Sequence, residues 1–257
     1  MKHISSRDNP LYKQLQRLSR GPRDGQAVLE GVHLCQEWLR HKGLPELALF
    51  DAGRLEHSAE LADLARDVPP SSCVSCEPAL VSSLSQVGHG QGVYFVVNLP
   101  VAEAPPRIAA NCLWLDRIQD PGNMGTLLRT AAAAGITEAY LSAGCASAWS
   151  PKVLRSAQGA HFAMALHEHA DLAGLSGRLD VPLVATALER AVPLYEADLP
   201  ARCAWLIGNE GQGVAPELLA LADVRVYIPQ APGVESLNAA VAAAICLFEQ
   251  RRRFPGV

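Results

Sequence analysis

Residues 204–238 read AWLIGNEGQGVAPELLALADVRVYIPQAPGVESLN, and this stretch decides the fold. An apolar run at 204–207 meets three glycines within residues 208–213, which lets the backbone turn sharply and approach a ligand closely. A second apolar run, at 224–228, is followed by a proline- and glycine-containing turn that leads into Ser236, a candidate N-cap for a long helix. Because ligands in α/β sheets bind outside the carboxyl ends of strands, we expect a pocket where these strand ends and this helix start meet.

A similar strand–turn–helix pattern lies upstream, where residues 120–131 read DPGNMGTLLRTA and Gly135 follows. Asn123 and Gly125 stand at the turn, and Arg129 falls one turn into the expected helix. One glycine-rich turn alone would indicate little, because turns use glycine in every class of protein. Three such stretches in a fixed order are far more specific.

Together these stretches resemble the signature of the SpoU (TrmH-like) family of RNA ribose 2'-O-methyltransferases, within the SPOUT superfamily. The resemblance covers roughly residue 112 to the C-terminus, and the order and spacing of all three motifs fit the family. The matching positions are Asn123, Gly125, Arg129 and Gly135 in the first motif, Gly208, Glu210 and Gly213 in the second, and Ile228, Pro229, Gly233, Ser236, Leu237 and Asn238 in the third.

The resemblance implies S-adenosylmethionine as the methyl donor. No metal is needed, because methyl transfer to a ribose hydroxyl is an in-line displacement governed by positioning. The residues that the resemblance assigns to the donor pocket are Thr186, Gly208, Ile228 and Leu237. The residues that it assigns to catalysis are Arg129, Asn123, Glu210, Ser236 and Asn238.

Arg129 is the family's candidate catalytic residue. A guanidinium deprotonates only far above neutral pH, so we expect Arg129 to orient the hydroxyl or an adjacent phosphate and to stabilise developing alkoxide charge, rather than to act as a base. Asn123 and Asn238 can each donate and accept hydrogen bonds. Glu210 can accept a proton or orient Arg129. Asn123 and Ser236 have a structural alternative, because both residue types also serve as helix caps.

The C-terminal half predicts an α/β fold with a largely parallel, helix-covered sheet. Its short buried strands alternate with helical stretches, which is typical of parallel sheets. The expected strands are 112–115, 139–141, 163–166, 183–187, 204–207 and 224–228. The resemblance further implies a deep trefoil knot, which periodicity could not have indicated.

Residues 100–109 are rich in proline and alanine without periodicity, which favours a linker. We therefore predict a substrate-binding domain at 1–99 and a methyltransferase domain at 110–257. The first domain alternates strands and helices and is similar to the extra N-terminal domain of rRNA-directed SpoU enzymes, a small α/β domain that resembles ribosomal RNA-binding proteins. The positions that carry this looser similarity are Ile4, Ser5, Ser6, Asn9, Pro10, Lys13, Glu30 and Gly31.

Basic charge is concentrated at the start of the chain. Residues 1–23 carry six basic side chains against one acidic one, although the whole chain has a net charge of −4. A basic N-terminal face can bind a phosphate backbone, and the segment 150–161 resembles a family segment near the RNA cleft. The candidate RNA contacts are Arg7, Lys13, Lys152 and Arg155. A solvated surface without a partner is the alternative for both groups.

Composition favours a globular, cytoplasmic protein. Of its 257 residues, 49% are hydrophobic, which is enough for a buried core. No apolar run reaches the length of a membrane span, and the polar N-terminus lacks the hydrophobic core of a signal peptide. The seven cysteines are odd in number and lack the spacing of a disulfide framework, which favours reduced thiols, as in the cytoplasm.

The sequence predicts no metal site. Cys73 and Cys76 form a lone CxxC motif, without the four ligands that structural zinc normally requires. His161, His167 and His169 lack a cysteine or acidic constellation at ligand spacing.

The last expected helix, from Ser236 to about Arg251, is apolar on almost every face. A helix that is apolar all round must be buried all round. One side can lie on the sheet, and the resemblance implies that the partner subunit of a homodimer covers the other side. A central helix in the core of a monomer is the alternative. The three arginines 251–253 suit the negative end of this helix.

The sequence therefore predicts an S-adenosylmethionine-dependent RNA ribose 2'-O-methyltransferase that acts on rRNA, with large-subunit rRNA favoured. A tRNA target is the first alternative, although the added N-terminal domain favours rRNA. A catalytically silent RNA-binding protein is the second, and the intact catalytic motif positions argue against it. A dinucleotide-dependent oxidoreductase is disfavoured, because the first strand is not followed by GxGxxG.

Overall fold

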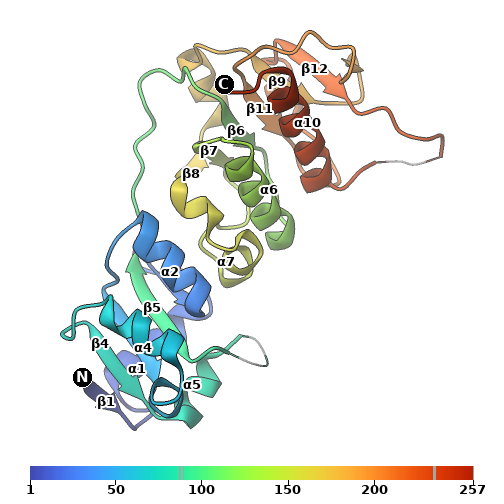
Figure 1. Ribbon diagram of the computed structural model, residues 1–257. Helices are drawn as coiled ribbons and strands as arrows, with labels where there is room; N and C mark the ends of the chain where they lie inside the picture. Colours follow the sequence, from blue (N-terminus) through green and yellow to red (C-terminus); the bar gives the residue numbers. More distant parts are fainter. Residues whose placement is uncertain (87, 89, 234–235, 257) are drawn as a thin grey trace. The chain divides into compact units, whose positions relative to one another are not determined.

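The computed structural model describes residues 1–86, 88, 90–233 and 236–256, and the chain forms two compact units. The first unit consists of residues 1–100 together with 149–162, and the second of 101–148 together with 163–257. Each unit contains a sheet with helices packed on it (Figure 1). The segment 149–162 therefore belongs to the first unit, although it lies in the C-terminal half of the sequence.

The first unit has a five-stranded mixed sheet in the order β1-β4-β3-β5-β2. β1, β4 and β3 are parallel, whereas β5 is antiparallel to β3 and β2. The strands are β1 (Lys2–Ile4), β2 (Gln26–Glu30), β3 (Leu47–Asp51), β4 (Cys73–Cys76) and β5 (Val93–Asn98). The helices are α1 (Pro10–Leu18), α2 (Val32–His41), α3 (Ala52–Leu55), α4 (Ala59–Arg66), α5 (Pro78–Leu84) and α7 (Pro151–Ala157), and α7 is followed by the 3₁₀ helix η1 (Ala160–Ala163).

Two sequence features of the first unit have clear structural outcomes. The start of α1 is confirmed, because the Asn9 side chain accepts a hydrogen bond from the Leu11 amide and Pro10 occupies the first turn. Cys73 and Cys76 lie in strand β4, which the sequence analysis did not predict. Both thiols are buried. Because residues three apart on a strand point to opposite faces of the sheet, the CxxC spacing does not bring the two thiols together.

The second unit has a seven-stranded, all-parallel sheet in the order β10-β12-β9-β11-β6-β7-β8. The predicted α/β class with a parallel sheet is therefore confirmed. The strands are β6 (Cys112–Leu115), β7 (Glu138–Ser142), β8 (Ala165–Ala170), β9 (Leu183–Thr186), β10 (Val192–Pro193), β11 (Ala204–Ile207) and β12 (Val224–Tyr227). The strand expected at 163–166 was misplaced, because η1 occupies the apolar run before β8.

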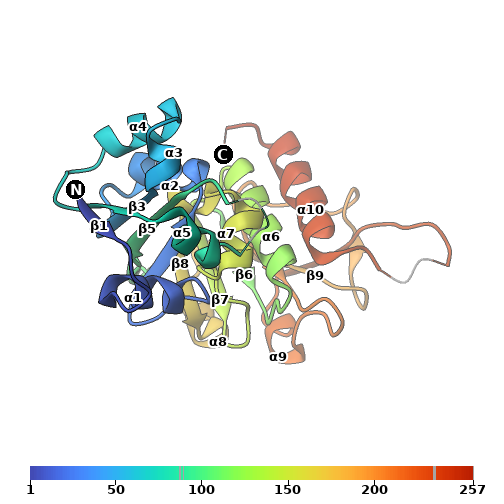
Figure 2. The ribbon, with the colours of Figure 1, turned by 90° about the horizontal axis from the view of Figure 1, so that it is seen from below.

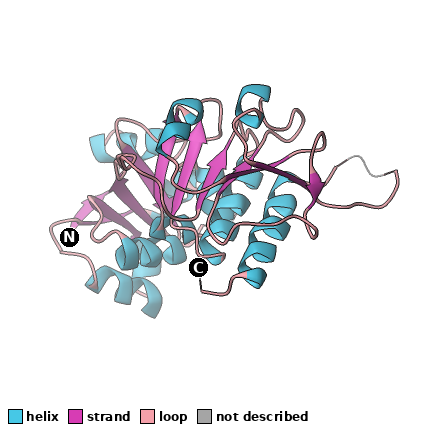
Figure 3. Ribbon diagram, turned by 90° about the horizontal axis from the view of Figure 1, so that it is seen from above, coloured by secondary structure: helices cyan, strands magenta, loops and turns pink. Residues whose placement is uncertain are grey.

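Helices cover both faces of this sheet. They are α6 (Pro121–Ala133), α8 (Leu172–Leu175), α9 (Pro216–Leu219) and α10 (Ala239–Arg253), with a 3₁₀ turn η2 (Ser176–Arg178). The long helices α6 and α10 pack against each other on one face, and the short helices α8 and α9 lie on the opposite face (Figures 2 and 3). The central strands β6 and β11 are buried along their whole length, as expected for a sheet covered on both sides.

The long C-terminal helix begins three residues later than predicted. Asn238, not Ser236, is the N-cap of α10, and its Oδ1 accepts hydrogen bonds from the amides of Ala240 and Val241. The prediction that Ser236 caps the helix was wrong, because the side chain that reaches the free amides of the first turn is the one directly before Ala239.

The helix is also less completely buried than its composition suggests. Val241 and Phe248 are 48% and 46% exposed. All three arginines lie in the last turn of α10, at its negative end as expected. Two of them also bind other segments: Arg251 donates to the carbonyl of Ala134 after α6, and Arg253 donates to the carbonyls of Leu194, Tyr195 and Ala197. Both side chains therefore tie α10 to neighbouring segments of the second unit.

Candidate functional site

A cavity of ≈ 490 Å³ opens at the carboxyl ends of β9, β11 and β12, beside the start of α10. Its walls come from the segments that follow these three strands and from the first turns of the helix. The lining residues are Thr186, Ala187, Leu188, Glu189, Ile207, Gly208, Asn209, Glu210, Gly211, Gln212, Gly213, Val214, Leu219, Val226, Ile228, Gln230, Ser236, Leu237, Ala239 and Ala242. All four residues predicted for the methyl donor lie on these walls. The pocket thus lies at the carboxyl ends of the strands, where ligands of α/β sheets usually bind.

The wall after β11 is a tight turn of residues 208–213. Asn209 and Gly213 exchange two backbone hydrogen bonds of 3.1 and 2.9 Å, and the Asn209 Oδ1 accepts the amides of Gly211 and Gln212, each at 3.0 Å. A Cβ at Gly208 would lie 2.1 Å from the amide nitrogen of Val214. Glycine at 208 is therefore required by the chain folding back on itself, in addition to any close approach of a ligand.

A chain of side-chain hydrogen bonds joins the three sequence motifs at the mouth of this turn. The Asn238 Nδ2 donates to the Asn123 Oδ1 at 2.8 Å, and the Asn123 Nδ2 donates to the Glu210 Oε1 at 3.1 Å. The Glu210 carboxylate also accepts the backbone amides of Gln119 and Asp120, at 3.4 and 3.3 Å. Three of the five predicted catalytic residues are therefore in direct contact.

The hydrogen bonds to Glu210 determine its charge. Burial, the largest single effect, acts to raise the pKa of this carboxyl. The hydrogen bonds from Asn123 and from backbone amides together outweigh burial and hold the pKa of Glu210 below its ordinary value. Glu210 is therefore ionised near neutral pH, and it acts as a hydrogen-bond acceptor that orients Asn123.

The capping alternative for Asn123 is wrong. Asp120 is the N-cap of α6, and its Oδ1 accepts the Asn123 amide at 2.8 Å. The Asn123 side chain is thus free to link Glu210 to Asn238. Ser236 is exposed on the cavity wall and makes no cap either, so its catalytic assignment stays a prediction.

Arg129 is exposed on α6 and is not among the described residues that line the cavity. It follows Asn123 by six residues, or roughly 9 Å along a helix axis. Its side chain therefore does not project from the same turn as the Asn123–Glu210 contact. The catalytic role of Arg129 stays a prediction.

The four candidate RNA contacts all belong to the first unit. Arg7 and Lys152 are exposed, and Arg155 is half-buried on α7. Lys13 forms an ion pair of 2.8 Å with Asp8, and the hydrogen bond from Lys13 lowers the pKa of Asp8. An exposed pair of this kind contributes little stability, so Lys13 can exchange Asp8 for a phosphate. The RNA-binding role of all four residues stays a prediction.

The described residues contain no group of three or more histidine, cysteine or acidic side chains that could hold a metal ion. Two of the three histidines singled out by the sequence have other surroundings. His161 is fully buried beside Trp149 and Phe162. His167 stacks on Tyr140 and bonds Glu138 at 3.0 Å. None of the described helices is both long and apolar enough to cross a membrane.

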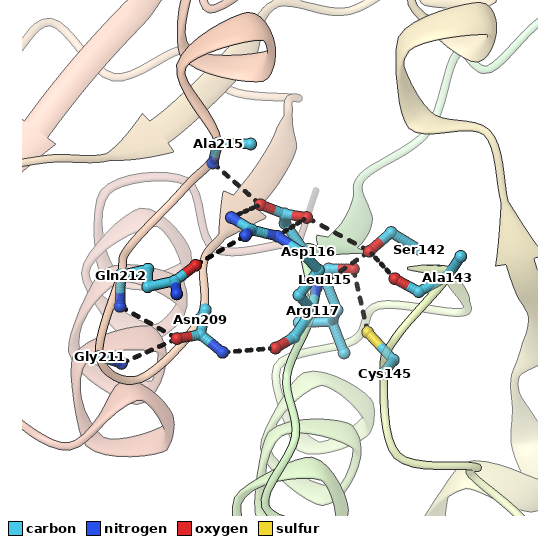
Figure 4. Close-up of polar contacts among 10 residues, drawn as sticks. All are labelled: Leu115, Asp116, Arg117, Ser142, Ala143, Cys145, Asn209, Gly211, Gln212 and Ala215. Carbon is cyan, nitrogen blue, oxygen red and sulfur yellow. Dashed lines mark hydrogen bonds and ion pairs between the residues drawn. The ribbon is translucent and has the colours of Figure 1, made fainter.

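A cluster that the sequence analysis missed lies next to the cavity turn (Figure 4). Asp116 directly follows β6 and is only 3% exposed, and Arg117 after it has a φ of 52°. Both bind the segment 209–215 through side-chain and backbone hydrogen bonds. A charged pair directly after an apolar strand could have marked these two residues in the sequence. Their partners could not have been inferred, because they lie almost a hundred residues away along the chain.

Comparison with known proteins gives consistent matches. Residues 110–248 match the profile of the SpoU rRNA Methylase family. An uncharacterized tRNA/rRNA methyltransferase of Synechocystis is 37% identical, with 97% of this chain and 93% of that protein covered. The 23S rRNA (guanosine(2553)-2'-O)-methyltransferase RlmP of Bacillus subtilis is 33% identical over 98% of this chain and its own full length. The crystal structure of the SpoU methyltransferase AviRb of Streptomyces viridochromogenes, in complex with AdoMet, superposes with a TM-score of 0.83 at 27% identity and covers 97% of this chain and 100% of that one.

Proposed function

This chain belongs to the SpoU rRNA methylase family and is an S-adenosylmethionine-dependent RNA 2'-O-methyltransferase, and we propose that its substrate is ribosomal RNA, with large-subunit rRNA favoured. The similarity to RlmP supports this substrate, because it extends over nearly the whole of both chains and so includes the N-terminal unit. As an rRNA-modifying enzyme the protein would act in the cytoplasm.

The cavity beside the 208–213 turn is the proposed binding site of the methyl donor. The observation that carries this proposal is that one cavity of ≈ 490 Å³ is lined by all four predicted residues, Thr186, Gly208, Ile228 and Leu237. The turn offers backbone groups to a ligand, and the apolar side chains of Ile228 and Leu237 suit an adenine-sized ring. When bound there, S-adenosylmethionine supplies a methyl group on a positively charged sulfur.

The residues beside the cavity would position the ribose. Asn123 and Asn238, fixed by Glu210, present amide groups that can hold a hydroxyl in line with the donor. The C–O bond forms as the C–S bond breaks, and the hydroxyl proton passes to solvent or a nearby base. Arg129 would stabilise the developing alkoxide or hold an adjacent phosphate, since a guanidinium keeps its charge at neutral pH.

A homodimer through α10 is part of the proposal. Val241 and Phe248 are about half exposed on α10, although this helix packs on α6 and on the sheet. The two side chains are seven residues apart and so lie on the same face of the helix, which supports an interaction surface there. Arg129 and Thr126 are exposed on the neighbouring helix α6, so a partner covering α10 would approach this catalytic candidate as well.

The trefoil knot and the substrate-binding role of residues 1–99 complete the proposal. β12 pairs with β9, whereas the following helix α10 packs on α6 and β11. The chain must therefore recross the carboxyl ends of β9 and β11, a path that supports a knotted C-terminus. An experimentally determined backbone trace tests the knot, and RNA binding by the full chain carrying Arg7→Glu and Lys13→Glu tests the substrate-binding role.

Mapping of ribose methylation tests the substrate. The 2'-O-methyl positions of rRNA and tRNA are compared between cells with and without the gene, and the purified enzyme is then tested on the RNA that loses a mark. We expect one large-subunit rRNA nucleotide to lose its methyl group. Loss of a mark only from tRNA would replace rRNA by tRNA as the substrate, and no lost mark in either RNA would contradict the proposed substrate altogether.

A further inference from the structure

Asp116 joins three segments at the carboxyl edge of the sheet. Its amide donates to the carbonyl of Ile207 at 2.9 Å, which links the end of β6 to the end of β11. Its Oδ1 accepts the Ser142 hydroxyl at 3.3 Å, and its Oδ2 accepts the Ala215 amide at 2.9 Å. A buried carboxylate is tolerated only when it is fully paired. Asp116 therefore fixes the start and the end of the segment 207–215.

Arg117 binds the middle of the same segment. Its side chain donates to both oxygens of Asp116, at 3.1 and 3.0 Å, and its Nη1 donates to the Gln212 Oε1 at 2.9 Å. Its backbone carbonyl accepts the Asn209 Nδ2 at 2.8 Å. Figure 4 shows these contacts on one side of the turn. Asn209 and Gln212, the two residues of this segment that Arg117 binds, both line the cavity.

The backbone of Arg117 is strained to make this arrangement. Successive side chains on a strand point to opposite faces, so neighbours in a strand cannot form a two-pronged ion pair. The left-handed φ of 52° at Arg117 brings its guanidinium back to the preceding carboxylate. A left-handed conformation is unfavourable for a residue other than glycine, and such strain persists where surrounding contacts enforce it.

We infer that Asp116 and Arg117 are positioning residues that preset the 208–213 turn for the methyl donor. Neither residue lines the cavity among the described residues, so they act through Asn209, Gln212 and Ala215. A turn that is already held in its binding conformation loses less freedom when the ligand binds. The inference rests on the proposed location of the methyl donor in this cavity.

The test is the affinity for S-adenosylmethionine, measured by calorimetry well below the melting temperature. Arg117→Ala is expected to raise the Kd roughly tenfold, and KM for the donor should rise with little change in kcat at saturation. Arg117→Lys should rescue poorly, because a lysine cannot bridge Asp116 and Gln212 together. Hydrogen exchange of the Gly211 and Gln212 amides should accelerate in the same variants.

Two further variants separate this role from general stability. Ser142→Ala removes a hydroxyl that donates to Asp116 and accepts the Arg117 amide, and Ser142 is not among the described residues that line the cavity. This variant decides the question if Arg117→Ala does not fold; it should weaken binding several-fold. Arg107→Ala is the matched control, because Arg107 also forms a two-pronged pair with an aspartate, Asp180, in the second unit. Its Kd should equal that of the wild type.

The outcomes distinguish this inference from the cavity assignment. Ala242→Trp fills the cavity from α10 and should abolish binding. Binding that survives Ala242→Trp, or no binding by the wild type, would overturn the cavity assignment and the inference with it. Binding that Ala242→Trp abolishes but Arg117→Ala and Ser142→Ala leave unchanged would overturn only the positioning role.

Discussion

Asn238 donates a hydrogen bond of 2.8 Å to Asn123, although 115 residues separate them in the sequence. The side-chain oxygen of Asn238 accepts backbone amides at the start of α10, and the Asn123 Nδ2 donates a hydrogen bond to Glu210. These hydrogen bonds join three segments: the start of α10, the first turn of α6 and the turn after β11. A change at the middle residue should therefore disturb all three.

Asn123→Ala should reduce methyl transfer by roughly tenfold or more while lowering the Tm by only a few degrees, about 2–4 °C for each kcal/mol lost in a chain of this size. It removes two exposed side-chain hydrogen bonds, each of which contributes about 1 kcal/mol, and it leaves the cap at Asp120 in place. Single-turnover methylation of the identified RNA gives the rate, and thermal unfolding gives the stability. Thr126→Ala on the same helix is the control and should retain the wild-type rate. Equal rates in both variants would remove Asn123 from the site.

Arg129→Ala should leave folding and methyl-donor binding nearly intact and lower the rate of transfer by about two to three orders of magnitude, as for the loss of one electrostatic stabiliser. Arg129→Lys separates two mechanisms, because lysine keeps the charge but lacks the planar fork. An orienting role predicts poor rescue at every pH, whereas a base predicts recovery at high pH. Wild-type activity in Arg129→Ala would exclude the residue from catalysis.

Local patterns predicted most of the second unit because its strands are short, apolar and bounded by turns. The residues assigned to the methyl donor came from the family resemblance, and the structure places them at the end of a strand, directly after one, or in the turn before α10. Their role in binding the donor stays a prediction. β4 was missed because it is only four residues long and Ser75 interrupts its apolar pattern. The strand at 163–166 was misplaced because a buried 3₁₀ turn and a buried strand give the same apolar signal over four residues.

The remaining errors concern contacts that are distant along the chain. Ser236 and Asn238 are both good caps by residue type, and the contact of Asn238 with Asn123 is invisible in the local sequence. The same holds for Asp116, whose partner Ala215 is 99 residues away. The sequence motifs pointed to residues that line the cavity, whereas only the structure shows which residues hold them in place.

Phe248→Glu should convert the proposed homodimer into monomers or make the protein insoluble. In the dimer interface the new carboxylate would be buried without a partner, which costs several kcal/mol of association free energy. Light scattering at micromolar concentration measures the oligomeric state. Leu221→Glu is the control, since Leu221 is exposed to a similar degree, 41%, but lies after α9 on the other face of the sheet. A wild-type protein that is already a soluble monomer would contradict the proposed dimer.

His161 should make the first unit less stable in acid. It is fully buried, and neither ring nitrogen has a hydrogen-bond partner among the described residues. Burial, and to a smaller extent the charge of Lys42, lowers the pKa of His161 from 6.5 to about 3. The unfolded chain therefore binds a proton first as the pH falls, and stability decreases from about pH 6.5 down to about pH 3. At pH 5 the loss is on the order of 2 kcal/mol.

His161→Phe should remove this part of the pH dependence, because phenylalanine fills the aromatic surroundings of Trp149 and Phe162 without a titrating group. Denaturant unfolding at pH 7.5 and pH 5 gives the difference in free energy for each protein. His57→Gln changes an exposed histidine of the same unit and should leave the wild-type difference intact. If His161→Phe and the wild type lose equal stability between the two pH values, groups other than His161 govern the acid sensitivity of the fold.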